Sequence, residues 1–79
     1  MHLIIAKVDQ VFYDGEAASV TLPGADGDLT VLSHHEPLIT TLREGAIVVR
    51  ASSLPGGEQQ YPIQSGLLEV RDNRATVIL

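Results

Sequence analysis

The clearest structural signal in the sequence is LLEVRDNRATVIL, residues 67–79. Two runs rich in Leu, Val and Ile flank the dipeptide Asp72-Asn73. A two-residue connection of this composition between apolar runs is typical of a tight β-hairpin. The pattern predicts one strand over residues 67–71, a turn at 72–73 and a second strand over 74–79.

Similar short runs precede this hairpin, separated by glycine and proline at intervals too short for a long helix. They predict strands over residues 3–8, 18–22, 28–32 and 46–51. Residues 38–42 fit either a strand or a single helical turn, and residues 52–60 are expected to form an exposed hairpin loop. Several short strands with turn signals at this spacing predict an all-β sandwich or barrel.

Length and composition narrow the class of protein further. A chain of 79 residues is expected to form one domain with one small core. Cysteine is absent, so disulfides, thiolate metal sites and a cysteine nucleophile are excluded. The longest apolar run, residues 3–6, is far shorter than the ~20 residues that span a bilayer. No signal peptide is recognisable.

The negative charge of the chain lies in its first half. Five Lys and Arg face ten Asp and Glu, which gives a net charge of −5. Residues 1–36 carry Lys7 and six of the acids, whereas residues 37–79 carry four arginines and the other four acids. A phosphate-binding basic surface is therefore not expected. The acidic half either keeps the protein soluble or offers a surface to a basic partner.

Few side chains suggest chemistry. Ser33-His34-His35-Glu36 is the one concentration of functional groups, but neighbours on an extended strand point to opposite faces, which disfavours a shared metal ion. Asp26 and Asp28 flank Gly27 and are read as a solvated turn rather than a calcium loop. No phosphate-binding glycine loop or serine-hydrolase elbow is present. The residues alone thus indicate a small acidic β domain that binds another protein through a sheet edge or an apolar outer face.

The spacing of the turns resembles a known family, the N-terminal domain of the epsilon subunit of F-type ATP synthases, called delta in mitochondria. The resemblance covers the whole chain, and residues 13–45 follow the family spacing without a gap. The segments that carry it are Tyr13-Asp14-Gly15, the stretch VTLPGADGDL at 20–29, HEPLITTLREG at 35–45, SGLLEV at 65–70 and ATVIL at 75–79. The family's central histidine, proline, leucine and threonine fall on His35, Pro37, Leu38 and Thr40.

The departures from the family pattern lie in loops. Thr30 replaces a glycine, Ser33-His34 replace Pro-Gly, Glu36 replaces an alanine and Ser65 replaces the first glycine of a pair. The family continues beyond its last strand into a two-helix hairpin, whereas this sequence stops at Leu79. We therefore expect a small β-sandwich of about ten short strands over residues 1–79, without the C-terminal helical hairpin.

The resemblance implies a role without catalysis. It implies a rotor-stalk subunit of a proton- or sodium-translocating ATP synthase that docks on the gamma subunit and the ring of c subunits. It places the protein at the periphery of the energy-coupling membrane, on the ATP-synthesising face, which is cytoplasmic in bacteria. It implies no cofactor, metal, nucleic acid or small-molecule substrate.

The resemblance also suggests which residues make contact. The candidate contacts with gamma are His35, Pro37, Leu38, Leu42 and Glu69, and those with the c-ring are Asp26, Gly27 and Asp28. Leu38, Ile39 and Leu42 are read first as core residues and otherwise as part of an apolar strip against gamma, and His35 fits a structural hydrogen bond to the Pro37 turn. Two other functions stay open: a free-standing binding module with another partner, and a small enzyme using His34, His35 and Glu36.

Overall fold

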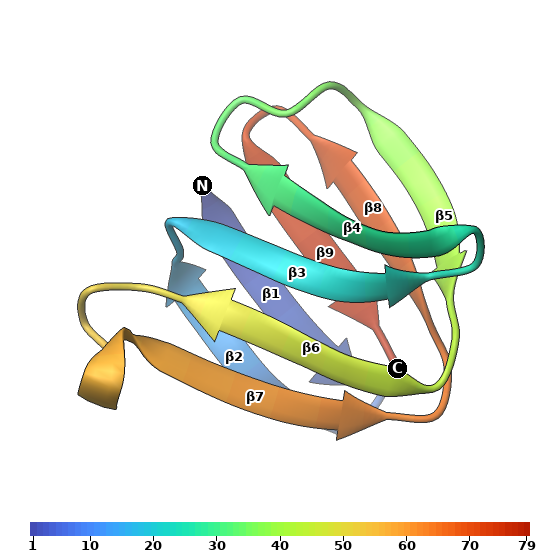
Figure 1. The fold of residues 1–79 in the computed structure, drawn as a ribbon, viewed down its shortest axis with the longest axis horizontal. Coiled ribbons are helices and arrows are strands. Elements are labelled where there is room, and N and C mark those ends of the chain that lie inside the picture. Colours follow the sequence, from blue (N-terminus) through green and yellow to red (C-terminus); the bar gives the residue numbers. More distant parts are fainter.

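The computed structural model describes residues 1–79 and is built almost entirely of β-strands (Figure 1). The one helix is a short 3₁₀ turn, η1. This confirms the all-β prediction, with nine strands in place of about ten. The elements are β1 (His2–Lys7), β2 (Gln10–Glu16), β3 (Ser19–Gly24), β4 (Gly27–Leu32), β5 (Leu38–Leu42), β6 (Gly45–Arg50), η1 (Pro55–Gly57), β7 (Glu58–Ile63), β8 (Gly66–Arg71) and β9 (Arg74–Ile78).

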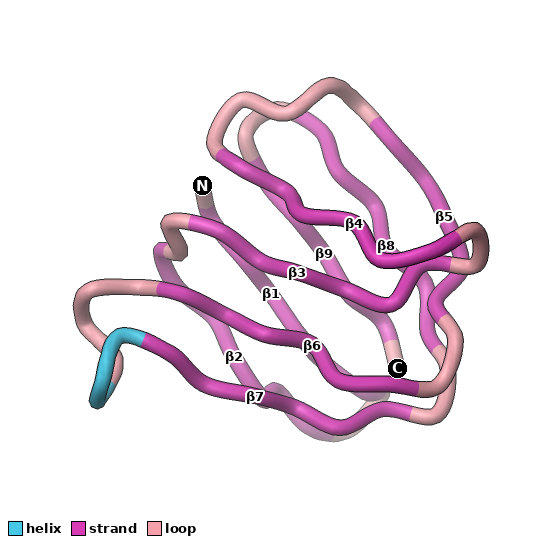
Figure 2. Tube along the Cα trace, in the orientation of Figure 1, coloured by secondary structure: helices cyan, strands magenta, loops and turns pink.

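The strands form two layers that pack face to face. One layer has the order β2-β1-β9-β8-β5, and the other has the order β4-β3-β6-β7. The layers appear as a rear and a front sheet in Figure 1, and Figure 2 shows how little of the chain lies in loops. They meet at one corner, where Gly24 of β3 pairs with Leu42 of β5. All pairs are antiparallel except β1 with β9, which places the first and last strands of the chain side by side.

The hairpin predicted from residues 67–79 is confirmed. Strands β8 and β9 pair from Leu67 with Ile78 to Arg71 with Arg74. Asp72 and Asn73 form the turn with φ angles of 51° and 58°. Two successive positive φ values define a turn whose twist matches that of the flanking strands, and Asp and Asn tolerate this conformation better than most residues.

The core lies between the layers and follows from the alternation along each strand. In β3, Val20 and Leu22 point inward, whereas the Thr21 hydroxyl points outward and hydrogen-bonds that of Thr30 at 2.9 Å. Burying an aliphatic side chain of this size stabilises the fold by about 1.5–3 kcal/mol. The buried cluster consists of Met1, Leu3, Ile5, Ala17, Val20, Leu22, Val31, Leu42, Ile47, Val49, Ile63, Leu68, Val70, Ala75 and Val77.

Two strands, β2 and β7, were not predicted from the sequence. Both lie at sheet edges, and β7 is mostly polar and contains Pro62. An edge strand needs partners on one side only, so it tolerates polar residues and proline that a central strand would not. Residues 52–60 are accordingly only partly a loop, because β7 begins at Glu58. Residues 38–42 form a strand rather than a helical turn.

No helix in the structure has the length and apolar character needed to cross a bilayer.

Candidate interaction site

The β3–β4 hairpin presents two carboxylates on a tight turn. Asp26 and Asp28 are both exposed, and Gly24 pairs with Gly27 across the turn. A Cβ atom on Gly24 would lie 2.6 Å from a Leu29 methyl group and 2.8 Å from the Gly27 carbonyl oxygen. Gly27 has a φ of 130°, which favours glycine. The two glycines therefore allow the compact turn that carries the acids.

Arg43 lies beside this turn, a contact that the sequence did not reveal. Its Nη2 atom is 3.8 Å from Oδ1 of Asp28, and both side chains are largely exposed. The Arg43 amide donates a hydrogen bond of 2.9 Å to the Pro23 carbonyl. In the opposite direction, the amide of Ala25, just after β3, donates a hydrogen bond of 3.0 Å to the carbonyl of Thr41 in β5. The acidic turn is thus attached to the end of β5.

The loop between β4 and β5 holds His35 by hydrogen bonds within the loop. The His35 amide donates to the Leu32 carbonyl at 3.2 Å, and the ring Nδ1 lies 2.8 Å from the Glu36 carbonyl oxygen. Because a carbonyl only accepts, Nδ1 carries the proton, and the exposed Nε2 is free for another partner. This supports the structural role for His35 beside the Pro37 turn, and it leaves one ring edge available.

His34, the preceding residue, anchors the same loop to the β8–β9 turn. It has a positive φ of 63°, and its amide donates a hydrogen bond of 2.8 Å to the side-chain oxygen of Asn73. Two turns that are far apart in the sequence are therefore joined at one end of the sandwich.

The structure brings the acidic turn and the His35 loop together. Both border a shallow hollow of about 360 Å³. The sequence analysis assigned these two groups to different partners, whereas in the fold they form one continuous surface. The lining residues are Gly24, Asp26, Gly27, Asp28, Leu29, His35, Leu38 and Thr40.

The other candidate contact residues fall into two groups. Leu42, offered by the sequence as a contact with gamma, is a core residue with 5% of its surface exposed, and Leu38 is half-buried against the core. The reason is that both point into the space between the layers, with Leu38 opposite Val70 in β8. Glu69 lies outward on β8, opposite the exposed Ile39 of β5. Pro37 is exposed in the loop.

An apolar surface, here called the apolar face, lies on one part of the outside of the β2-β1-β9-β8-β5 layer, whose remaining outward positions carry polar residues such as His2, Asp14 and Thr76. The strand register places four residues of the apolar face side by side across neighbouring strands: Val11 pairs with Ala6, Ala6 with Ile78, and Ile78 with Leu67. Ile39 lies on the neighbouring strand and is 67% exposed. We define the apolar face as Ala6, Val11, Ile39, Leu67 and Ile78.

The outer face of the second layer is polar by comparison. It carries the Thr21–Thr30 hydroxyl pair and an ion pair between Arg50 and Glu58 at 3.5 Å. Among the six large hydrophobic residues that the molecule exposes, Leu32 alone belongs to this layer. Exposed apolar side chains gathered on one side of a small domain make that side a candidate interaction surface.

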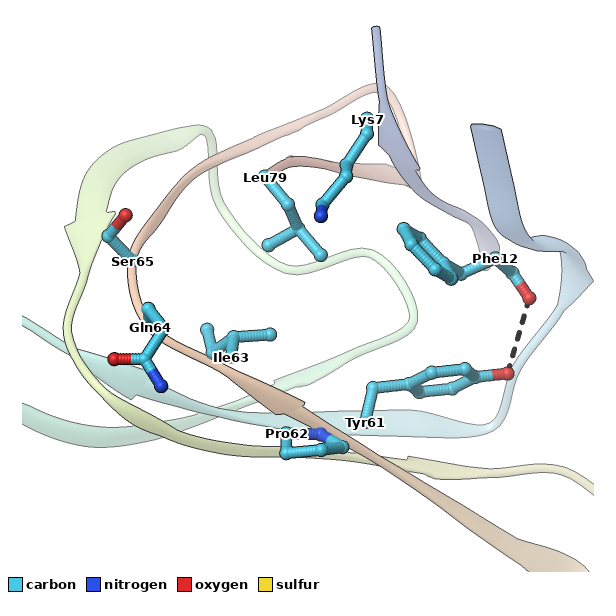
Figure 3. A pocket seen from close by; sticks show the side chains of 8 residues that line it. All are labelled: Lys7, Phe12, Tyr61, Pro62, Ile63, Gln64, Ser65 and Leu79. Atoms are coloured by element: carbon cyan, nitrogen blue, oxygen red, sulfur yellow. Dashed lines mark hydrogen bonds between the residues drawn. The ribbon is translucent and has the colours of Figure 1, made fainter. Parts of the chain in front are cut away.

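A separate cleft of about 540 Å³ opens between the two layers near Lys7 and Leu79. Phe12, Tyr61 and Ile63 form its apolar wall, and Figure 3 shows the Lys7 side chain pointing into it. The Tyr61 hydroxyl donates a hydrogen bond of 3.3 Å to the Phe12 carbonyl, so it joins β7 to β2 across the open edge of the sandwich. Burial raises the pKa of the Tyr61 phenol, and the nearby Tyr13 adds to the rise.

The raised pKa of Tyr61 predicts a loss of stability in alkali. The folded state favours the neutral phenol, so its contribution is complete below the unfolded pKa of about 10 and is lost as the pH rises through the folded pKa. In urea titrations, Tyr61→Phe should lose less stability than the wild type above pH ~10. At neutral pH the variant should cost about 1 kcal/mol or less, because one hydrogen bond is lost. Equal alkaline losses in the two proteins would contradict the assignment.

The structure contains no group of three His, Asp or Glu side chains placed to hold a metal ion. His2 contacts Asp14 at 2.7 Å at the surface, away from the His35 loop. What the fold does present is a set of surfaces: an acidic turn, a histidine loop and an apolar face. These features define the class of the protein as a small β-sandwich module whose candidate site is a set of exposed surfaces.

Comparison with known proteins gives the family. The sequence model of the family described as ATP synthase, delta/epsilon chain, β-sandwich domain matches residues 1–79. An ATP synthase epsilon chain from Polaromonas naphthalenivorans is 38% identical over 78 residues, which is 99% of this chain and 55% of the relative. One from Latilactobacillus sakei is 36% identical over 74 residues, 94% of this chain and 51% of the relative. The chain belongs to the delta/epsilon family of ATP synthase β-sandwich domains.

Solved structures agree with this family. A chain of the Euglena gracilis mitochondrial ATP synthase, in a structure of its OSCP, F1 and c-ring, superposes with a TM-score of 0.84 at 26% identity, over 96% of this chain and 48% of that one. A chain from a structure of the Tetrahymena thermophila mitochondrial ATP synthase central stalk and c-ring superposes with a TM-score of 0.79 at 12% identity. The superposition covers 98% of this chain and 60% of that one. The second match supports the fold alone. The chain spans about half the length of the curated relatives that it matches.

Proposed function

We propose that this domain is a non-catalytic part of the rotor stalk of a proton- or sodium-translocating F-type ATP synthase. It docks on the gamma subunit and on the c-ring and helps to couple ring rotation to ATP synthesis. It works at the periphery of the membrane, on the ATP-synthesising side. The observation that carries the proposal is the one-sided apolar face on a fold of the delta/epsilon family.

The apolar face is the surface that we assign to gamma. Its exposed side chains supply the desolvated centre that a stable protein interface needs, and Glu69 lies within it beside Ile39. The exposed ring edge of His35 and Pro37 precede β5, close in sequence to Ile39 of this face, whereas Leu67 aligns with Thr41 towards the other end of that strand. We expect them at the rim of the same interface, where polar groups set orientation more than affinity.

The acidic turn is the surface that we assign to the c-ring. Asp26 and Asp28 are exposed, and the turn is held firmly enough to present them in one orientation. Exposed acid–base pairs contribute only about 0.2–1 kcal/mol each, so their part is to steer docking and register rather than to hold the complex.

A binding assay tests the proposal as a whole. The purified domain should bind a subcomplex of gamma and the c-ring from the same organism, and it should bind gamma alone more weakly. Failure to bind either one would reject the stalk function and leave a free-standing binding module as the better explanation.

Neutralising the acidic turn should weaken ring binding without affecting the fold. For Asp26→Asn with Asp28→Asn, we expect the affinity for the gamma–c-ring subcomplex to fall by a few-fold to about 30-fold. This range follows if each aspartate forms one exposed ion pair with the ring worth about 0.2–1 kcal/mol. The loss should be larger at low salt, where the Debye length is ~30 Å rather than ~8 Å. Stability should change by less than about 0.5 kcal/mol per site.

A matched control removes the same charge elsewhere. Asp9 and Asp72 are also exposed turn residues and make no ion pair in the structure. Asp9→Asn with Asp72→Asn should therefore change affinity and salt dependence much less. Equal affinities and salt slopes for the wild type and the acidic-turn variant would mean that the two acids only solvate the surface.

A further inference from the structure

Arg43 is the one basic side chain that the structure places in contact with the acidic turn. Its Nη2 atom lies 3.8 Å from Oδ1 of Asp28. Arg50 is engaged elsewhere, with Glu58, and Lys7 lies at the cleft between β2 and β7. A turn that the sequence presents as doubly negative therefore carries a cation of its own.

The position of Arg43 is fixed by the backbone rather than by the ion pair. Its amide hydrogen-bonds the Pro23 carbonyl, and the Ala25 amide hydrogen-bonds the Thr41 carbonyl. Gly45 brings the chain against the Pro23 ring, since a Cβ atom there would lie 2.9 Å from Pro23 Cβ. These contacts hold the backbone of the β5–β6 corner against the β3–β4 turn, so the Arg43 side chain starts from a point from which it can reach Asp28.

We propose that Arg43 is an intramolecular competitor for the cation that the acidic turn binds. The proposal rests on the assignment of the turn to a basic surface of the c-ring. While Arg43 pairs with Asp28, the turn and Arg43 together carry about one net negative charge. A partner's lysine or arginine must displace the Arg43 guanidinium from Asp28, and Arg43 then repels that cation. Arg43 thus lowers the affinity for basic groups in general and favours a partner whose cations are correctly placed.

The sign of the effect distinguishes competition from a supporting role. Arg43→Gln keeps the length and polarity of the side chain and removes its charge. It should tighten binding of the domain to the gamma–c-ring subcomplex by about two- to fivefold, the range that exposed ion pairs span. The salt dependence of binding should become steeper, because a more negative turn attracts the ring more strongly.

Two further variants isolate the cause. Arg50→Gln removes the same charge from an exposed ion pair on the polar outer face, so it should leave affinity nearly unchanged. In the background of Asp28→Asn, Arg43→Gln should give a much smaller gain, since the carboxylate for which Arg43 competes is absent. The double-mutant cycle measures this coupling directly.

The outcomes separate this inference from the proposed function. If the wild type does not bind the subcomplex, the stalk assignment itself fails. If the wild type binds and Arg43→Gln weakens binding, Arg43 supports the contact and competition is rejected. Competition is also rejected if Arg43→Gln and Arg50→Gln raise the affinity equally, because the loss of any positive charge would then explain the result. It is rejected as well if Arg43→Gln raises the affinity just as much in the Asp28→Asn background.

Discussion

Placing aspartate at two positions of the apolar face should abolish most of the binding to gamma. Ile39→Asp with Leu67→Asp introduces two charges at exposed sites that the interface would desolvate. The few hot-spot residues at the centre of an interface contribute about 2 kcal/mol or more each, so if either site is such a residue we expect a loss of at least about 30-fold in affinity. The measurement is a titration of the variant onto gamma alone and onto the gamma–c-ring subcomplex.

The polar outer face supplies the control for this experiment. Leu32 is 57% exposed on β4, and Thr30 is an exposed neighbour on the same side of that strand. Thr30→Asp with Leu32→Asp carries a similar cost in strand propensity but lies on the other layer. Its affinity for gamma should stay within a few-fold of the wild type. If both double variants lose binding equally, the apolar face is not the surface that meets gamma.

Truncating a core leucine should have the largest effect on stability. Leu22 lies at the centre of β3 and has no exposed surface. Leu22→Ala should lower the free energy of unfolding by about 2–5 kcal/mol, from lost burial and the cavity left behind. A domain of 79 residues is stabilised by roughly 4–12 kcal/mol in total, so this single change should remove a large part of its stability.

Urea denaturation followed by circular dichroism measures this loss. Ile39→Ala is the matched comparison, because it also shortens an aliphatic strand residue but at an exposed position. It should change stability by no more than about 0.5 kcal/mol. A small loss for Leu22→Ala, similar to that for Ile39→Ala, would contradict the two-layer core.

Much of the fold could be predicted from local patterns. The β8–β9 hairpin follows from two apolar runs around Asp72-Asn73, whose backbone angles the turn requires. The predicted strands around residues 18–22, 28–32 and 46–51 match β3, β4 and β6 within a few residues. The edge strands β2 and β7 could not be predicted in this way, because a strand paired on one side has a weaker apolar pattern.

The sequence pointed to the acidic turn and the His35 loop as candidate contacts, but not to the residues that form the apolar face, to Arg43 or to how these surfaces are arranged. The turn motifs around Asp26–Asp28 and His35–Pro37 stand out in the sequence and match the family. Leu42 is read from the sequence first as core and otherwise as a contact, and its position between the layers makes it a core residue. Arg43 gives no sequence signal, because an arginine after a strand is ordinary until the fold brings Asp28 within 3.8 Å.

The sequence by itself determined the strand class, the hairpin turns, the inward and outward alternation and the family, because all of these depend on residues close together in the chain. The tertiary structure alone decided which strands outside the predicted β8–β9 hairpin are neighbours. Pairing of β1 with β9 and of β8 with β5 aligns outward residues from three separate stretches of the chain, residues 6–11, residue 39 and residues 67–78, into the apolar face. Strand order depends on how two layers exclude water from a shared core, and no local pattern specifies it.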